Sequence, residues 1–155
     1  MEIIIERALH EDALKLIEVQ NLGFQEDYEK YGKCPSYQES IENMIDMIKN
    51  AIVYKIIVDD KIIGDIIVRK REANHYYLRT ISVIPEYQNL GIGKKAIEFI
   101  EKDNGDGTKW SLITPEGSLR NRHFYETLGY KKIGEKVHSE KLTLIEYQKN
   151  IMPTS

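Results

Sequence analysis

A pair of glycines followed by two lysines is the segment of this sequence best suited to binding an anion. It reads Gly91-Ile92-Gly93-Lys94-Lys95-Ala96 and leads into an amphipathic run. Glycine lets a backbone approach a ligand closely, and the N–H groups at the start of a helix attract phosphate. The segment fits the G-x-G-x-x-G/A pattern of dinucleotide-binding turns and shares a Gly-Lys pair with ATP-binding P-loops. A glycine-rich helix start without any ligand is the third interpretation.

The residues around the turn disfavour both nucleotide motifs. The first glycine of a dinucleotide fingerprint directly follows a strand, whereas here Glu86–Leu90 separate the expected strand end from Gly91. The next expected strand, 109–114, ends without the acidic residue that binds ribose. A P-loop needs Ser or Thr where this chain has Lys95, and Gly where it has Gln88. A nucleotide-binding protein therefore stays as an alternative, and it predicts that ATP or NAD stabilises the protein against thermal unfolding.

Tyr125, in the segment "NRHFYETLGY" at 121–130, is a second residue whose type could do chemistry. A phenol of pKa ~10 can donate its proton in a reaction only when it is held in place and polarised. Since the chain has ten tyrosines, a structural role is the alternative. The position of Tyr125 in a helix next to other apolar residues is compatible with both roles.

Strands and helices alternate around these two segments. Strands are expected at 2–7, 51–58, 61–70, 75–84, 109–114, 131–137 and 142–148, and helices at 10–24, 91–104 and 118–130. A capping-box pattern at Ser36 and Glu39 predicts the start of one more helix. The polar and aromatic segment 21–37 contains two glycines, which predicts a loop or a broken helix. Strands grouped in hairpins before a strand–helix–strand crossover predict a mixed α/β fold rather than a regular βαβ array.

Composition indicates one soluble domain spanning 1–155. Net charge is −3 with 41% hydrophobic residues, which argues against a nucleic-acid partner. The single cysteine, Cys34, excludes an intrachain disulfide and favours a reducing, cytoplasmic location. The N-terminus does not resemble a signal peptide, no apolar run approaches the ~18 residues of a membrane span, and the four histidines show no metal-ligand spacing. We therefore expect no metal and no membrane association.

Two blocks, read together, resemble the GNAT superfamily of N-acetyltransferases. Val83-x-Pro85, then Gln88-x-x-Gly91-x-Gly93 and an amphipathic helix, is similar to the acetyl-coenzyme A turn of that superfamily, and "NRHFYETLGY" is similar to its second block. The resemblance covers about 54–137. It implies a GNAT fold: a mixed, mostly antiparallel sheet of about six to seven strands, helices on both faces, and a splayed central strand pair. Leu78, Ile81 and Val83 cannot share one face at period two, which independently predicts a β-bulge in that pair.

The resemblance also implies roles for individual residues. Tyr125 would be the general acid, and backbone at Ile81 and Val83 would hold the pantetheine arm. The residues expected to bind acetyl-coenzyme A, the co-substrate, are Ile81, Val83, Gln88, Asn89, Leu90, Gly91, Ile92, Gly93, Lys94, Asn121 and Tyr125. Gln88 would either brace the turn or contact a phosphate. Many members place an asparagine three residues before Asn121, where this chain has Ser118, so either residue is a candidate for that contact.

The acceptor side departs from the family pattern. Many members carry a glutamate on the strand before the turn, whereas "YYLRTIS" offers Arg79 and no carboxylate. The base that removes the amine proton is then a water chain or a carboxylate of segment 21–37, namely Glu26, Asp27 or Glu29. Alternatively, part of the amine arrives already neutral. Arg79 is expected either to bind an acceptor carboxylate or to be an exposed arginine. Tyr28 and Tyr31 are expected in the wall of the acceptor site or in helix packing.

The expected function is transfer of the acetyl group of acetyl-coenzyme A to a primary amine of a small molecule, amino acid or peptide. The alternative is a catalytically weak coenzyme-binding sensor or assembly module on the same fold, which the missing strand carboxylate favours. The resemblance also allows a homodimer paired through an edge strand. The sequence does not name the acceptor.

Overall fold

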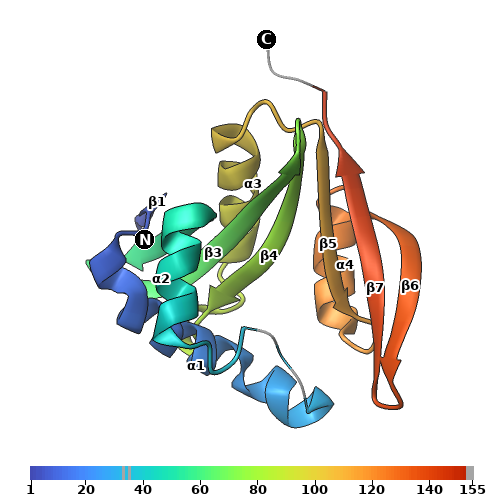
Figure 1. Ribbon diagram of the computed structural model, residues 1–155, viewed down its shortest axis with the longest axis horizontal. Coiled ribbons are helices and arrows are strands. Elements are labelled where there is room, and N and C mark those ends of the chain that lie inside the picture. Colours follow the sequence, from blue (N-terminus) through green and yellow to red (C-terminus); the bar gives the residue numbers. More distant parts are fainter. Residues whose placement is uncertain (33, 35, 153–155) are drawn as a thin grey trace.

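The computed structural model describes residues 1–32, 34 and 36–152, and its strands form one sheet (Figure 1). The strand order in that sheet is β1-β2-β3-β4-β5-β7-β6. The strands are β1 (Ile3–Arg7), β2 (Ile52–Val58), β3 (Lys61–Glu72), β4 (His75–Val83), β5 (Lys109–Pro115), β6 (Lys131–Ser139) and β7 (Leu142–Asn150). Neighbouring strands are antiparallel except β4 and β5, which are parallel. The mixed, mostly antiparallel sheet that the sequence predicted is confirmed.

Helices cover both faces of the sheet, with α1 and α2 on one face and α3 and α4 on the other (Figure 1). Their bounds, with two short 3-10 turns, are η1 (His10–Asp12), α1 (Ala13–Tyr31), α2 (Ile41–Asn50), η2 (Pro85–Tyr87), α3 (Ile92–Asp103) and α4 (Leu119–Thr127). Alternation along β3 separates two cores, because successive side chains of a strand point to opposite faces. Ile67 packs with α1 and α2, whereas Ile66 and Val68 pack in the larger core that contains α3 and Tyr125.

The central strands β4 and β5 diverge soon after they meet. They pair only where His75–Tyr77 face Lys109–Ser111, and β4 has no β5 partner from Leu78 onward among the described residues. A bulge lies on the other side of β4, since Ile67 pairs with Thr80 and Val68 with Leu78, leaving Arg79 as the extra residue. The predicted splayed pair and the predicted bulge are both confirmed. The divergence leaves backbone groups of β4 free for a ligand.

The prediction of a loop or a broken helix at 21–37 is wrong over most of its length. Helix α1 runs unbroken to Tyr31 and ends where Gly32 adopts a left-handed conformation, φ 70°. Gly23 does not break the helix but lets it approach β4: a Cβ there would lie 3.3 Å from Ser82 Cβ and from the carbonyl oxygen of Val83. This glycine is a packing residue, which a propensity argument cannot distinguish from a helix breaker.

The predicted capping box at Ser36 and Glu39 is also wrong. Helix α2 begins at Ile41, and its N-cap is Ser40, whose hydroxyl accepts the N–H of Asn43 at 3.1 Å. Ser36 is instead buried, with its Oγ 2.7 Å from Thr80 Oγ1 on β4. The hydroxyl that the pattern assigned to a helix end thus attaches the α1–α2 connection to the sheet. Within the described residues, no helix is long and apolar enough to cross a membrane.

Candidate active site

The glycine turn connects the end of β4 to α3 and leaves the start of that helix open. Asn89 and Gly91 both have positive φ, 63° and 81°, so the chain turns sharply between η2 and α3. Gly91 is the N-cap and provides no side chain to bond the helix. The first helical bond is from Lys95 N–H to the Gly91 carbonyl oxygen at 3.3 Å. The N–H groups before Lys95 therefore lack intrahelical partners and can bind an anion.

Gln88 holds this turn against β4. Its Nε2 donates to the carbonyl oxygen of Val83 at 2.9 Å, which corresponds to the bracing role among the two that were expected. Gly91 and Gly93 lack a side chain for different structural reasons. Gly91 has the left-handed conformation, with open space around it, whereas a Cβ on Gly93 would lie 3.1 Å from the ring of Phe124 on α4. The turn is thereby packed against the helix that carries Tyr125.

The other predicted turn residues are placed in different environments. Ile92 is fully buried in the main core, so only its backbone is available to a ligand. Leu90 and Lys94 are exposed, and Lys94 forms no ion pair with a described residue. Backbone N–H groups from the turn and one or two exposed lysines suit a diphosphate, whose charge the helix dipole also favours.

The backbone of β4 faces the divergence at the two predicted positions. Ile84 N–H donates to Ile63 on the neighbouring strand at 2.9 Å. Backbone groups along a strand alternate between its two neighbours, so those of Ile81 and Val83 point away from β3. No strand pairs with them there among the described residues. The C=O of Val83 already accepts the hydrogen bond from Gln88. The N–H groups of Ile81 and Val83 and the C=O of Ile81 can bond a peptide-like arm, and a free N–H can polarise a thioester carbonyl.

Tyr125 lies in the main core beside other aromatic rings. The ring packs edge-on against Phe124 and Tyr130, at centroid distances of 5.1 and 5.9 Å. Its hydroxyl forms no hydrogen bond with a described residue, although the ring is buried. Burial raises the pKa of Tyr125, and the nearby Asp27 and Tyr77 raise it further. A fixed ring with an unpartnered, protonated hydroxyl is suited to donate to a ligand.

Among the three carboxylates considered as a base, Asp27 is the one whose charge acts on Tyr125. Burial raises the pKa of Asp27, and Glu26 adds to that effect while Lys30 and Arg120 oppose it. Glu29 instead accepts a hydrogen bond from Gln25 on the exposed side of α1. The unbroken course of α1 brings Asp27 near α4, which a loop interpretation of this segment did not reveal.

The remaining predicted residues occupy distinct places. Asn121 is half-buried and its side chain forms no hydrogen bond with a described residue, so its amide group is available to a ligand. Tyr28 stacks on Tyr37 at 4.5 Å and is 40% exposed. Tyr31 is buried, and its unpartnered hydroxyl lies 3.1 Å from where a Cβ on Gly117 would stand. This contact joins the end of α1 to the loop before α4.

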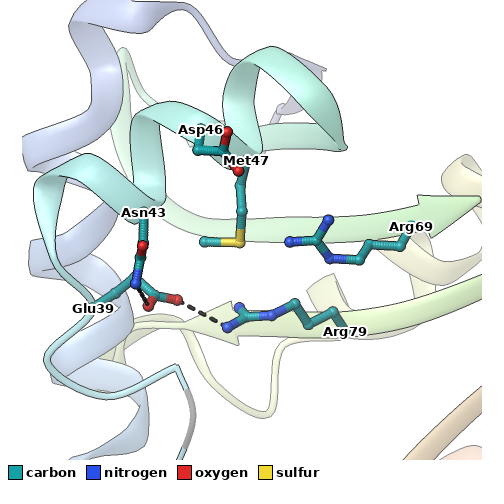
Figure 2. A pocket seen from close by; sticks show the side chains of 6 residues that line it. All are labelled: Glu39, Asn43, Asp46, Met47, Arg69 and Arg79. Carbon is teal, nitrogen blue, oxygen red and sulfur yellow. Dashed lines mark hydrogen bonds and ion pairs between the residues drawn. The ribbon is translucent and has the colours of Figure 1, made fainter.

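Arg79 is neither free nor exposed. Its guanidinium forms an ion pair with Glu39 at 2.9 Å (Figure 2). The same group also donates to Thr80 Oγ1 at 3.1 Å. The sequence did not indicate Glu39 as the ion-pair partner of Arg79, nor Arg69 on β3 as its neighbour in space. No local pattern links residues so distant in sequence. Among the described residues, no group of three or more His, Cys, Asp or Glu is placed to bind a metal ion.

Comparison with known proteins agrees with this geometry. The family model described as acetyltransferase (GNAT) domain matches residues 49–132, more than half of the chain. No curated protein matches the sequence. Among solved structures, the chain is similar to the PaiA N-acetyltransferase of Thermoplasma acidophilum in complex with coenzyme A, with TM-score 0.74, 23% identity, and coverage of 97% of this chain and 100% of that one.

Two further structures share the fold at lower identity. The ribosomal-protein-S18-alanine N-acetyltransferase of Escherichia coli has TM-score 0.81 and 13% identity over 99% of this chain and 97% of that one. A GNAT family acetyltransferase of Elizabethkingia anophelis with acetyl-CoA bound has TM-score 0.72 and 14% identity, over 96% of this chain and 98% of that one. The glycine turn, the divergent central strands and the matched domain together show that this chain belongs to the GNAT acetyltransferase family.

Proposed function

We propose that the protein is an N-acetyltransferase that transfers the acetyl group of acetyl-CoA to a primary amine of a small molecule, amino acid or peptide. The observation that carries this proposal is the buried Tyr125, whose hydroxyl has no hydrogen-bond partner among the described residues and whose helix packs against the glycine turn. The divergence of β4 from β5 supports it, because it leaves backbone at Ile81 and Val83 without strand partners. The structural neighbours bound to coenzyme A or acetyl-CoA add support for the co-substrate.

Each step of a direct transfer has a candidate group in this chain. Acetyl-CoA supplies an activated thioester, and the N–H of Val83 or Ile81 polarises its carbonyl group. The amine nitrogen bonds to the acetyl carbon as the carbon–sulfur bond breaks, and Tyr125 gives its proton to the departing sulfur. A phenol of raised pKa is a weak acid, so this proton moves as negative charge develops on sulfur. Tyr125 then regains a proton from solvent.

Asp27 is the base that we propose for the amine. The amine must lose one proton to become a neutral amide, and a carboxylate whose pKa is raised by burial accepts a proton more readily. Its position near Tyr125 allows acid and base to act on the same acetyl group, directly or through one water molecule. No carboxylate on β4 is needed for this arrangement.

Calorimetric titration and steady-state kinetics test the proposal. Wild-type protein should bind acetyl-CoA and release coenzyme A when a suitable amine from a panel is added. Tyr125→Phe should lower kcat by roughly 100-fold or more while leaving acetyl-CoA affinity within a few-fold, since general acid catalysis contributes about 10²–10⁴. Tyr130→Phe is the control: its hydroxyl donates to Glu101 at 3.0 Å, so it should affect stability and not kcat.

A catalytically weak protein that binds acetyl-CoA as a sensor is the second candidate function. It is favoured because β4 carries no carboxylate. It predicts acetyl-CoA binding without coenzyme A release for any amine of the panel. Failure of acetyl-CoA to bind at millimolar concentration would contradict both candidates. Unchanged turnover in Tyr125→Phe would remove Tyr125 as the acid and leave the transfer itself standing.

A further inference from the structure

A charged pocket lies between α2 and the strands β3 and β4 (Figure 2). Its volume is about 250 Å³. Its lining residues come from the start and middle of α2, from the connection before it and from the two strands: Glu39, Asn43, Asp46, Met47, Arg69 and Arg79. Five of these six side chains are polar, so the pocket suits a charged group better than an apolar one.

The charges of the pocket are only partly paired. Arg79 is neutralised by Glu39, whose side chain is 8% exposed and whose second oxygen accepts a hydrogen bond from Asn43 at 3.4 Å. The side chain of Arg69 forms no hydrogen bond or ion pair with any described residue, although the residue is half-buried. Figure 2 shows the guanidinium groups of Arg69 and Arg79 side by side, both on the side of the strands that faces α2. The pocket therefore presents one guanidinium group, that of Arg69, which forms no ion pair with a described residue.

The strand register places Arg69 opposite the point where β4 and β5 diverge, near the proposed site of acetyl transfer. Arg69 pairs with Tyr77, which is the last residue of β4 that still pairs with β5. Tyr77 is also close enough to Tyr125 to raise its pKa. Arg79 is the bulge residue of β4, and Ile81 follows it by two positions, roughly 7 Å along a strand. A group bound at Arg69 thus lies within the length of a small molecule from the proposed site of the amine.

The composition of the pocket selects a carboxylate over a phosphate. With Glu39 committed to Arg79, the remaining charges are Arg69 and, at the exposed rim, Asp46, which accepts a hydrogen bond from Asn50 at 2.7 Å. One free guanidinium matches a singly charged carboxylate, which it can bind with two parallel hydrogen bonds. A doubly charged phosphate would meet the same cation and the repulsion of two nearby carboxylates.

We propose that Arg69 binds a carboxylate of the acceptor, so that the preferred substrates are amines that also carry a carboxylate a few bonds from the nitrogen. This inference rests on the proposed acetyltransferase function for its biological meaning. It replaces Arg79 by Arg69 as the anion-binding residue, and Arg79 becomes a positioning residue that holds Glu39 in the pocket wall. Amino acids with a side-chain amine, ω-amino acids and peptide C-termini near lysine have the required chemistry.

Ligand-observed NMR with matched pairs of amines tests the inference without any turnover. The probes are 6-aminohexanoate against hexylamine and 4-aminobutyrate against butylamine, with 4-aminobutylphosphonate as the phosphate-like probe. Wild-type protein should bind at least one amino acid of the series at least 10-fold more tightly than its matched amine. Arg69→Gln should abolish that preference, and Asp46→Asn should tighten amino-acid binding about 2- to 5-fold because a repelling charge is removed. Arg7→Gln is the matched control, since Arg7 lies over the ring of Tyr54 in the core on the other face of the sheet.

The outcomes separate this inference from the proposed function. Equal affinity for acids and amines, or a preference that survives in Arg69→Gln, would overturn it, as would tighter binding of the phosphonate. Acetyl-CoA binding is titrated separately, so loss of the proposed function would appear there and not in the NMR series. When an acceptor is turned over, Arg69→Gln should raise KM for the amino acid at least 10-fold and leave KM for the matched amine unchanged.

Discussion

Asp65 should make the protein less stable as pH rises through the neutral range. This residue lies on β3 at the centre of the sheet and is fully buried. Its Oδ1 accepts a hydrogen bond from Ser82 at 2.5 Å, while Oδ2 has no partner among the described residues. Burial raises the pKa of Asp65 from 3.8 to about 7, with Glu39 acting in the same direction and Ser82 and Arg79 opposing. The ionised form is thus the unfavourable one in the folded protein.

The sign and size of the effect follow from linkage. Because the folded pKa is above the unfolded one, the folded state binds the extra proton between pH 3.8 and about 7. Its stability is highest below that interval, falls by up to about 1.4 kcal/mol per pH unit within it, and levels off above it. Between pH 5 and pH 8 the loss attributable to Asp65 amounts to roughly 2 to 3 kcal/mol.

Asp65→Asn tests this reasoning by urea denaturation at pH 5, 6, 7 and 8. The amide cannot ionise, so the free energy of unfolding of the variant should decline less steeply with pH than that of the wild type. A constant offset is also expected, because the amide nitrogen lies where Oδ2 finds no partner. Asp60→Asn is the control, since Asp60 is exposed and its φ of 63° suits asparagine. Parallel pH profiles for wild type and Asp65→Asn would refute the argument.

Three further substitutions test the turn, the pocket wall and the main core. Gly91→Ala should lower the free energy of unfolding by about 1 kcal/mol because Gly91 has a left-handed conformation, and Gly91→Asn should lower it less. Urea denaturation measures both changes, and equal losses would mean that backbone conformation is not the cause. Glu39→Gln should cost about 1 to 2 kcal/mol by leaving Arg79 without its partner, and a neutral result would indicate that the ion pair contributes nothing. Tyr54→Phe should lower the free energy of unfolding by about 1 kcal/mol, because it removes the hydrogen bond to Asp103 at 2.6 Å. The loss is small because water can hydrate the exposed Asp103 again, and thermal unfolding at fixed pH measures it.

Local patterns were sufficient where the interactions themselves are local. The glycine turn, its position before a helix and the alternation along the strands could be predicted because φ preferences and side-chain periodicity act within a few residues. The bulge in β4 was predictable for the same reason, since a break in period two is visible in the order of Leu78, Ile81 and Val83. The resemblance of two blocks to a known family extended this to the sheet as a whole.

Local patterns gave wrong predictions at positions where tertiary contacts determine the structure. Gly23 has the appearance of a helix breaker, yet its missing side chain lets α1 lie against Ser82 and Val83. Ser36 has the spacing of a helix cap, yet it bonds Thr80, a residue 44 positions away. In both cases the local preference is worth about 1 kcal/mol, which close packing or a buried hydrogen bond readily exceeds.

The sequence by itself indicated most of the strands and helices and the turn that is the candidate anion site, and its resemblance to a known family indicated Tyr125 as the candidate acid. Only the tertiary structure decided which groups surround them. The divergence of β4 from β5 frees the backbone of Ile81 and Val83, the length of α1 brings Asp27 toward Tyr125, and the pairing of Arg79 with Glu39 leaves Arg69 as the available cation. These relations join residues far apart in the chain, and their energies depend on burial and distance, which no sequence spacing records.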